Sequence, residues 1–145
     1  MANRFVVQRH DASSLHFDVR LEIDGVLVSW AVPKGPSTDP AQRRLARRVD
    51  DHALDHIDVE GRLGSGTVIV WDTGTYEQRT EGSAADALAR GHLTVVLHGH
   101  KLTGGYAFIR TGGDDWLLIK TRDDVDPMTP DDRSVLTGRT NDDYA

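Results

Sequence analysis

The 145-residue chain contains no cysteine. Disulfide bonds, thiolate metal sites and cysteine nucleophiles are therefore excluded, so any bound metal must be held by histidine or carboxylate side chains. The chain also has no apolar run approaching the roughly 18 residues that a membrane span requires, and its first residues lack the apolar centre of a signal peptide. We therefore expect a cytoplasmic protein with no membrane partner, of a size that suits one domain with one core.

Three familiar catalytic motifs are absent as well. The sequence has no Gly-x-Ser-x-Gly nucleophile elbow, no P-loop and no glycine-rich dinucleotide turn. If the chain is a hydrolase, a metal-activated water is then the natural attacking group.

Acidic charge is concentrated at the C-terminal end. The net charge of −6 argues against a nucleic-acid partner, but the residues after Thr121 contain three arginines and seven aspartates, a net −4. The rest of the chain is close to neutral. Between residues 34 and 48, one lysine and four arginines face a single aspartate, which leaves room for a local basic patch. We expect residues 1–122 to form the domain and residues 123–145 to form an acidic tail that is flexible or loosely docked.

Short apolar segments separated by turn residues indicate a mainly β protein. The sequence predicts strands at 5–7, 15–22, 26–32, 66–72, around Tyr76, and at 93–98, 106–110 and 116–120. Turns are expected at Asp24-Gly25, Thr73-Gly74 and 112–114. Short connections make neighbouring strands antiparallel, in a barrel or a sandwich.

Two short helices are expected beside the strands. Thr38 or Asp39, followed by Pro40, is typical of a helix start and predicts a helix over 41–48. Ser83 and Gly91 are suited to begin and end a second helix over 84–90.

One strand carries the polar residues that stand out. Between residues 15 and 22 apolar and polar residues alternate, so one face of the strand presents His16, Asp18, Arg20 and Glu22. Together with His10, these imidazoles and the carboxylate can hold a divalent transition metal and leave positions open for water and substrate. The guanidinium of Arg20, on the same face, could bind two phosphate oxygens. The competing interpretation is the ordinary solvated face of a half-buried sheet.

Three other features could contact an anion. The segment 50–56 contains His52 and His56, which could supply a general acid or a phosphate donor, or could simply belong to a charged loop. Lys34, between a proline and a glycine, either reaches an anionic ligand or is an exposed turn residue. The four arginines of the expected helix over 41–48 either follow a phosphate backbone or form a solvated face. We expect surface or structural roles for the later histidines, His92, His98 and His100.

Many blocks of the sequence, in order along nearly the whole ordered chain, resemble the 3′-phosphoesterase domain of bacterial DNA ligase D. The blocks are residues 5–22, 24–27, 29–36, 44–46, 51–52, 60–61, 66–72, 97–99, 101–102 and 116–120. So many matches in order are more specific than any single His-x-Asp pattern.

The resemblance implies a fold and an activity. The fold is an antiparallel β-barrel over residues 1–122, here with the two short helices flanking it. The activity is manganese-dependent, with Co²⁺ or Zn²⁺ as alternative ions, and belongs to non-homologous end joining. It removes a terminal ribonucleoside from a DNA 3′ end, leaving a 3′-phosphate, and then removes that phosphate to expose a 3′-OH.

The resemblance also implies the site residues. The expected metal ligands are His10, His16 and Asp18. The expected catalytic set adds Arg20 and His52 on the scissile phosphate, where we expect His52 to protonate the leaving oxygen. Further residues expected to bind substrate phosphate are Gln8, Lys34, Arg44 and His56.

The expected partners are DNA or RNA-tipped DNA 3′ ends near the nucleoid. If the chain works as a stand-alone protein, separate ligase, polymerase and Ku proteins are further expected partners.

Three departures from the family pattern suggest an alternative. The family often has tyrosine at the position of His56, its longer loop before Gly66 is reduced here to residues 62–65, and the chain begins almost at the first strand, without the family's N-terminal arm. The alternative is a catalytically weak DNA-end-binding or scaffold module of a repair complex. A third hypothesis is a barrel metalloenzyme acting on a free phosphorylated metabolite.

Overall fold

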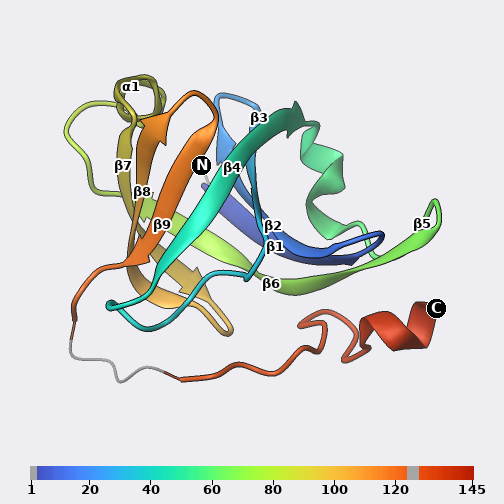
Figure 1. Cartoon of the computed structure of the whole chain (residues 1–145). Helices are drawn as coiled ribbons and strands as arrows, with labels where there is room; N and C mark the ends of the chain where they lie inside the picture. The colour runs from blue at the N-terminus through green and yellow to red at the C-terminus, as the bar shows by residue number, and fades with distance from the viewer. Residues whose placement is uncertain (1–2, 124–127) are drawn as a thin grey trace.

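A computed structural model of the chain describes residues 3–123 and 128–145, and most of them lie in β-strands (Figure 1). The strands are β1 (Arg4–Asp11), β2 (Leu15–Ile23), β3 (Val26–Val32), β4 (Arg43–His52), β5 (Gly61–Leu63), β6 (Gly66–Gln78), β7 (His92–Gly99), β8 (Thr103–Gly112) and β9 (Asp115–Lys120). The helical elements are α1 (Ala84–Arg90) and the 3-10 turns η1 (Leu54–Asp58) and η2 (Asn141–Tyr144). A mainly β protein is therefore confirmed.

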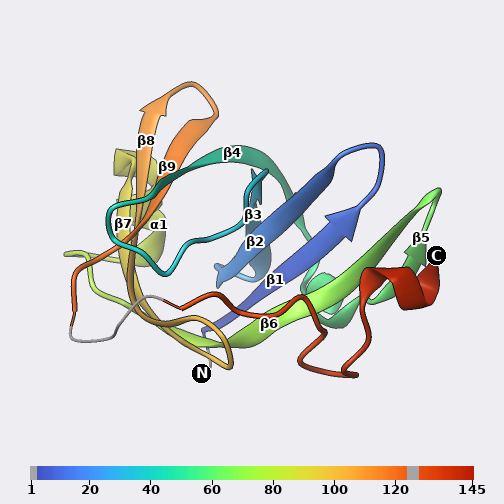
Figure 2. The same ribbon diagram turned by 60° about the horizontal axis from the view of Figure 1, so that its bottom comes forward.

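The strands close into an antiparallel barrel. Their order is β1-β2-β3-β4-β9-β8-β7-β6, and β6 pairs back onto β1, so the ring has eight strands. Figure 2 shows β1, β2, β3, β4 and β6 curving around the interior. The short strand β5 pairs with the other edge of β6 and extends beyond the ring. Closure removes the exposed edges that an open sheet would present.

Large aromatic side chains fill the interior. Trp30 packs against Phe108 with ring centroids 4.6 Å apart and meets the edge of Trp116 at 5.5 Å. These three residues come from β3, β8 and β9, so they join two arcs of the barrel. The apolar side of α1, where Ala87 is buried, packs against the same core. Helix α1 begins at Ser83 and ends at Gly91 as expected.

The helix expected over 41–48 is wrong, because this segment forms β4. Pro40 instead occupies a turn in which the backbone N–H of Gln42 donates to Asp39, and the carboxylate of Asp39 accepts from Ala41. Aspartate followed by proline suits such a turn as well as it suits a helix start. Pairing with β3 and β9 then extends the chain and closes the barrel, which outweighs local helix propensity. Within the described residues α1 is thus the only α-helix, and two flanking helices are not found.

The turn expected at Thr73-Gly74 is also wrong, because β6 runs through it. Gly74 is needed for close approach of strands, since a Cβ there would lie 2.1 Å from the carbonyl oxygen of His98 on β7. The irregularity in the strand lies two residues before Thr73, where the register with β1 skips Trp71. A bulge of this kind turns a strand without ending it.

The described part of the C-terminal segment, residues 128–145, lies along the outside of the barrel (Figures 1 and 2). Asn141 is only 2% exposed. Its side chain accepts a hydrogen bond from Arg9 and donates to the backbone of Arg9 and Thr67, which belong to β1 and β6. Because residues 124–127 lie outside the described residues, the boundary at 122/123 and the flexible tail stay predictions.

Glu60, just before β5, holds the same segment at a second point. Its carboxylate accepts hydrogen bonds from the hydroxyls of Ser134, Thr137 and Tyr144 and from the backbone N–H of Val70. Burial opposes ionisation of Glu60, but these hydrogen bonds outweigh it and lower the pKa of the carboxyl below its ordinary value of 4.5.

Docking of residues 134–144 should therefore weaken in acid. Because the folded-state pKa of Glu60 is depressed, its contribution to stability is complete above pH 4.5 and is lost as pH falls through the folded pKa. We expect hydrogen-exchange protection of residues 134–144 to drop in acid before that of the barrel strands does. In Glu60→Gln the protection should be lower already at neutral pH. Protection that follows the barrel strands at every pH would contradict this account.

Candidate active site

The polar face of β2 is covered, so its interpretation as a solvated sheet face is wrong. Asp18 is 7% exposed and Arg20 is 4% exposed. In the sheet register Gln8 of β1 lies opposite Asp18, and Ser29 of β3 lies opposite Arg20. The turn η1 packs over this face through the side chain of Gln8. Buried charges at this depth require partners, and each of the polar side chains has one.

Three potential metal ligands, His10, His16 and Asp18, meet at one place and form the metal trio. One carboxylate oxygen of Asp18 lies 3.3 Å from Nε2 of His16 and 3.8 Å from Nδ1 of His10. All three donor atoms lie within 4.8 Å of one another. Donors that share one ion through bonds of about 2.1 Å lie roughly 3.0 to 3.5 Å apart, so this trio fits one transition ion after small adjustments.

The ring of His16 is oriented for metal binding. Its Nδ1 lies 3.3 Å from the carbonyl oxygen of Ser14 and can donate there, while Nε2 faces Asp18 and is the nitrogen that would bind a metal. Metal-bound histidines commonly use their second nitrogen in this way. The hairpin between β1 and β2 supplies Ser14, so the loop that ends the hairpin also fixes the ligand.

The three groups differ in their affinity for protons. A hydrogen bond with Asp18 raises the pKa of His16 above 6.5, despite burial. Burial and the neighbouring His16 lower the pKa of His10. Burial opposes ionisation of Asp18, but the hydrogen bond from His16 and the charge of Arg20 outweigh it and lower the pKa of Asp18. At neutral pH Asp18 is therefore the carboxylate that a metal ligand must be.

Arg20 joins this trio to the rest of the site. Its Nε donates to the side chain of Gln8 at 2.7 Å, and its Nη1 donates to Ser29 at 2.8 Å and to Nδ1 of His52 at 3.0 Å. Its Nη2 lies 3.5 Å from the carboxylate of Asp18. Three of the five guanidinium N–H groups are thus used inside the protein, and Nη2 is the group left to face a phosphate. The two-oxygen contact expected for Arg20 would require part of this network to rearrange.

Gln8 holds η1 in place. It is fully buried, and its amide nitrogen donates to the backbone oxygens of His56 and Val59, while its oxygen accepts from Arg20. No amide group of Gln8 is left over for substrate, so Gln8 positions other groups.

His52 lies between a donor and an acceptor. Its Nδ1 is 3.0 Å from Nη1 of Arg20 and 3.0 Å from the backbone oxygen of Asp50. Because a guanidinium only donates, neutral His52 accepts from Arg20 and carries its proton on Nε2, whereas the imidazolium form can donate from Nδ1 to Asp50. The ring of His56 lies beside the His52 ring, with centroids 4.7 Å apart. Burial, followed by the charges of Arg20 and His52, lowers the pKa of His56.

A comparison with known families agrees with this arrangement. The family model described as the DNA ligase D 3′-phosphoesterase domain matches residues 8–110, which include every expected site residue. The chain belongs to this family.

Relatives of this family are longer proteins. The chain is 46% identical to the multifunctional non-homologous end joining protein LigD of Pseudomonas aeruginosa, over 94% of this chain and 18% of that protein. It is 44% identical to the LigD protein of Mycobacterium tuberculosis, over 86% of this chain and 17% of the relative. The LigD protein of Mycolicibacterium smegmatis is 38% identical, with shares of 92% and 19%. The chain therefore spans less than a fifth of the length of these relatives.

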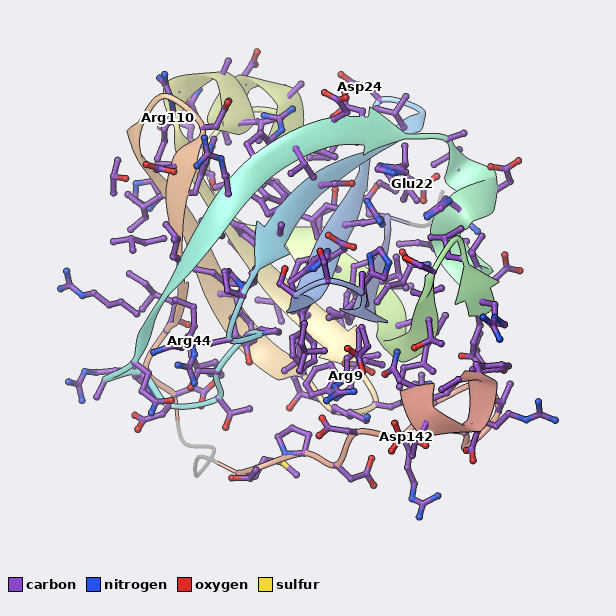
Figure 3. The ribbon with its side chains drawn as sticks, turned by 45° about the vertical axis from the view of Figure 1, so that its right-hand side comes forward. Arg9, Glu22, Asp24, Arg44, Arg110 and Asp142 are labelled. Carbon is purple, nitrogen blue, oxygen red and sulfur yellow. The ribbon has the colours of Figure 1, made fainter. Side chains whose placement is uncertain are left out.

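Two residues expected in the phosphoesterase site lie apart from this cluster. Lys34 and Arg44, together with Pro33, Arg43 and Leu45, line a separate hollow of 270 Å³. In the described part of the chain no hydrogen bond or ion pair joins either residue to the metal trio or to Arg20. Figure 3 shows Arg44 near the start of β4, whereas His52 ends the same strand. Eight residues of strand correspond to about 26 Å, so Arg44 and His52 lie far apart along β4.

Sequence reasoning assigned no role to Ser29, although the residues carried a signal for it. The two-residue turn Asp24-Gly25 pairs Ile23 with Val26, and counting back along the hairpin places Ser29 opposite Arg20. Ser29 is a buried hydroxyl in an otherwise apolar strand, and it accepts from Arg20 while donating to the backbone of Leu27. A buried polar residue facing a buried charge is a positioning candidate.

No helix within residues 3–123 and 128–145 is both long enough and apolar enough to cross a lipid bilayer.

We expect Ser29→Ala to loosen Arg20 while leaving the metal ligands intact. A buried donor that loses its acceptor costs about 1–3 kcal/mol, so the free energy of unfolding should fall by that amount. Metal affinity, measured by calorimetry, should stay within twofold of wild type, while affinity for inorganic phosphate falls several-fold. Thr73→Val, which removes a hydroxyl bonded to Phe5 away from the site, is the matched control. Equal phosphate affinity in both variants would rule out a positioning role for Ser29.

Proposed function

We propose that this domain is a metal-dependent hydrolase that removes a 3′-terminal ribonucleoside or a 3′-phosphate from DNA. The observation that carries the proposal is the continuous arrangement from the metal trio through Asp18 to Arg20 and on to His52. It sets a metal site, a permanent cation and an N–H donor side by side, which is what phosphoryl transfer requires. Membership of the 3′-phosphoesterase family supports the same reaction class.

Manganese is the metal we propose, with Co²⁺ or Zn²⁺ as alternatives. His10, His16 and Asp18 would hold it, because two imidazoles and one carboxylate suit a first-row transition ion and would leave positions open. When bound, such an ion supplies Lewis-acid stabilisation of negative charge and makes water a stronger nucleophile at neutral pH.

The protein's own groups would manage charge and protons during hydrolysis. Arg20 would face the phosphoryl oxygens with Nη2 and would be held in place by Gln8 and Ser29. His52, as the imidazolium whose Nδ1–H donates to the backbone oxygen of Asp50, would give its Nε2 proton to the leaving oxygen and become neutral imidazole. In the monoesterase reaction the bond between phosphorus and the 3′ oxygen breaks, and a water oxygen takes its place. The products are a 3′-OH end and inorganic phosphate.

The diesterase reaction differs only in the bond that breaks. There the oxygen that leaves is the 5′ oxygen of the terminal ribonucleoside, and the strand keeps the phosphate at its 3′ end. The same water addition and the same proton donor serve both steps. A single site could therefore carry out the two reactions in sequence.

The proposed biological role is end healing in non-homologous end joining. The support is that the LigD relatives carry this process in their names. The proposed partners are DNA or RNA-tipped DNA 3′ ends and, because the chain spans less than a fifth of those relatives, ligase, polymerase and Ku components acting with it.

The decisive test uses a 5′-labelled primer–template that ends in a ribonucleotide or in a 3′-phosphate, incubated with Mn²⁺. We expect conversion of the first substrate to a 3′-phosphate end and then to a 3′-OH end. His16→Ala should abolish both reactions, by at least a hundredfold, together with metal binding, and Arg20→Ala should abolish them while metal binding persists. His98→Ala, which removes an exposed histidine paired with Glu77, is the control and should act like wild type. Binding without any product would favour a scaffold module, and preference for small phosphate esters over DNA ends would favour a metabolite enzyme.

His56 allows a sharper test of the proton-donor side of the site. A tyrosine hydroxyl at this position would keep a donor beside His52 without adding a group whose charge competes with Arg20. We expect His56→Tyr to raise turnover about two- to tenfold, while His56→Phe lowers it. Turnover is measured under single-turnover conditions on the 3′-phosphate substrate. If both variants behave alike, the ring at position 56 fills space and donates nothing.

A further inference from the structure

The outward side of β4 carries cationic side chains that the proposed reaction does not use. Arg43, Leu45 and Arg47 alternate with the inward-facing Arg44 and Ala46, and Ala46 is fully buried in the core. The side chain of Arg47 is 67% exposed, and Arg43 and Leu45 are exposed as well. A helix would have stacked the arginines one turn apart. On a strand Arg43 and Arg47 share a face but lie about 13 Å apart.

The sheet register places Arg47 in line with the candidate active site. Asp18 of β2 lies opposite Ala31 of β3, and Ala31 lies opposite Arg47 of β4. Directly opposed residues in an antiparallel sheet point to the same side, so the three side chains share the outer face of the barrel. Two strand spacings separate Asp18 from Arg47, which is about 10 Å.

The surface between Asp18 and Arg47 carries only small, apolar side chains. Ala31 has a single methyl group, and Pro33, which directly follows β3, is exposed. Among the described residues no acidic side chain lies in this row between Asp18 and Arg47. A polymer could cross from the metal trio to β4 without meeting a charged obstacle.

The hollow near the start of β4 adjoins this face through Arg43 and Leu45. Lys34, Arg43 and Arg44 line this hollow with Pro33 and Leu45, and its lining contains no acidic residue. Three cations converging on one concave site form an anion-binding environment, because each raises the local positive potential. The hollow and Arg47 together form a basic strip that borders the candidate active site.

We propose that this strip, composed of Arg47, Arg43 and the hollow, binds the sugar–phosphate backbone of the DNA strand upstream of the scissile phosphate. Arg47 would contact a phosphate near the one being hydrolysed, and Arg43 would contact one farther along the same strand. The inference rests on the proposed function, since it assumes that a DNA end occupies the metal trio. It assigns a path to the remainder of that strand.

One acidic and one apolar residue beside the strip determine how the test is designed. Asp115 lies 3.9 Å from Arg47, and with side chains 67% and 53% exposed this ion pair is weak. Bound phosphate would compete with Asp115 for Arg47 and would be repelled by Asp115. Leu45, 51% exposed, faces outward beside Leu117 of β9, so a protein partner is the other occupant that this face could accept.

The experiment measures binding of a fluorescent primer–template that ends in 3′-OH, in the presence of Mn²⁺, so that no hydrolysis occurs. We expect Arg43→Gln/Arg47→Gln to weaken binding at least tenfold. The slope of log affinity against log salt concentration should also flatten by about 0.7 to 0.9 for each phosphate that the variant no longer neutralises. Asp115→Asn should tighten binding about two- to threefold, because it removes both the competitor and the repulsion.

The matched control is Arg79→Gln/Arg90→Gln, which removes the same charge from residues outside the strip. Arg79 has an exposed acidic partner, Glu77, just as Arg47 has Asp115. This control should keep the wild-type affinity and salt slope. If wild type binds DNA but the strip variant matches the control, the strip is not the DNA path and is left to a protein partner. If wild type itself does not bind the DNA end, the proposed function and the strip both fail.

Discussion

Burial of the Arg20 guanidinium is the constraint on which the rest of the site depends. Moving an unpaired charge out of water costs several kcal/mol, so Arg20 can be 4% exposed only because partners surround it. Gln8 comes from β1, which lies directly beside β2, and His52 comes from β4, which is separated from β2 by β3. Asp18 comes from β2 itself. One buried charge therefore sets the orientation of the groups on both sides of it.

The barrel makes this burial possible by bringing strands together in a fixed register. The outer face of β1, β2 and β3 would be open to water in a simple sheet, but Gln8 anchors η1 over it. On the opposite edge, pairing of β6 with β1 and docking of residues 128–145 through Glu60 and Asn141 hold β1 in place. The metal trio thus sits on a wall that is supported from both sides, as an accurately positioned site requires.

Sequence patterns predicted the parts of the molecule in which local and tertiary preferences agree. The β2 alternation placed His16, Asp18 and Arg20 on one face, and the Asp24-Gly25 turn led into β3 as expected. The segment 41–48 failed because Asp39 and Pro40 suit a turn and a helix start equally, and only pairing with β3 and β9 selects the strand. Gly74 failed because glycine marks both turns and close strand contacts, and only the position of His98 distinguishes them.

The sequence alone determined the chemistry that is available: without cysteine, any metal ligands had to be imidazole and carboxylate, and the order of matched motifs indicated the family. Tertiary structure decided which of the candidates act together. It joined Arg20 to Ser29 and His52, buried Gln8 beneath η1, and placed Lys34 and Arg44 in a hollow beside Arg43. The physical reason is that side-chain period and turn type are local properties of the chain. Which faces meet depends on barrel closure, which pairs residues far apart in sequence.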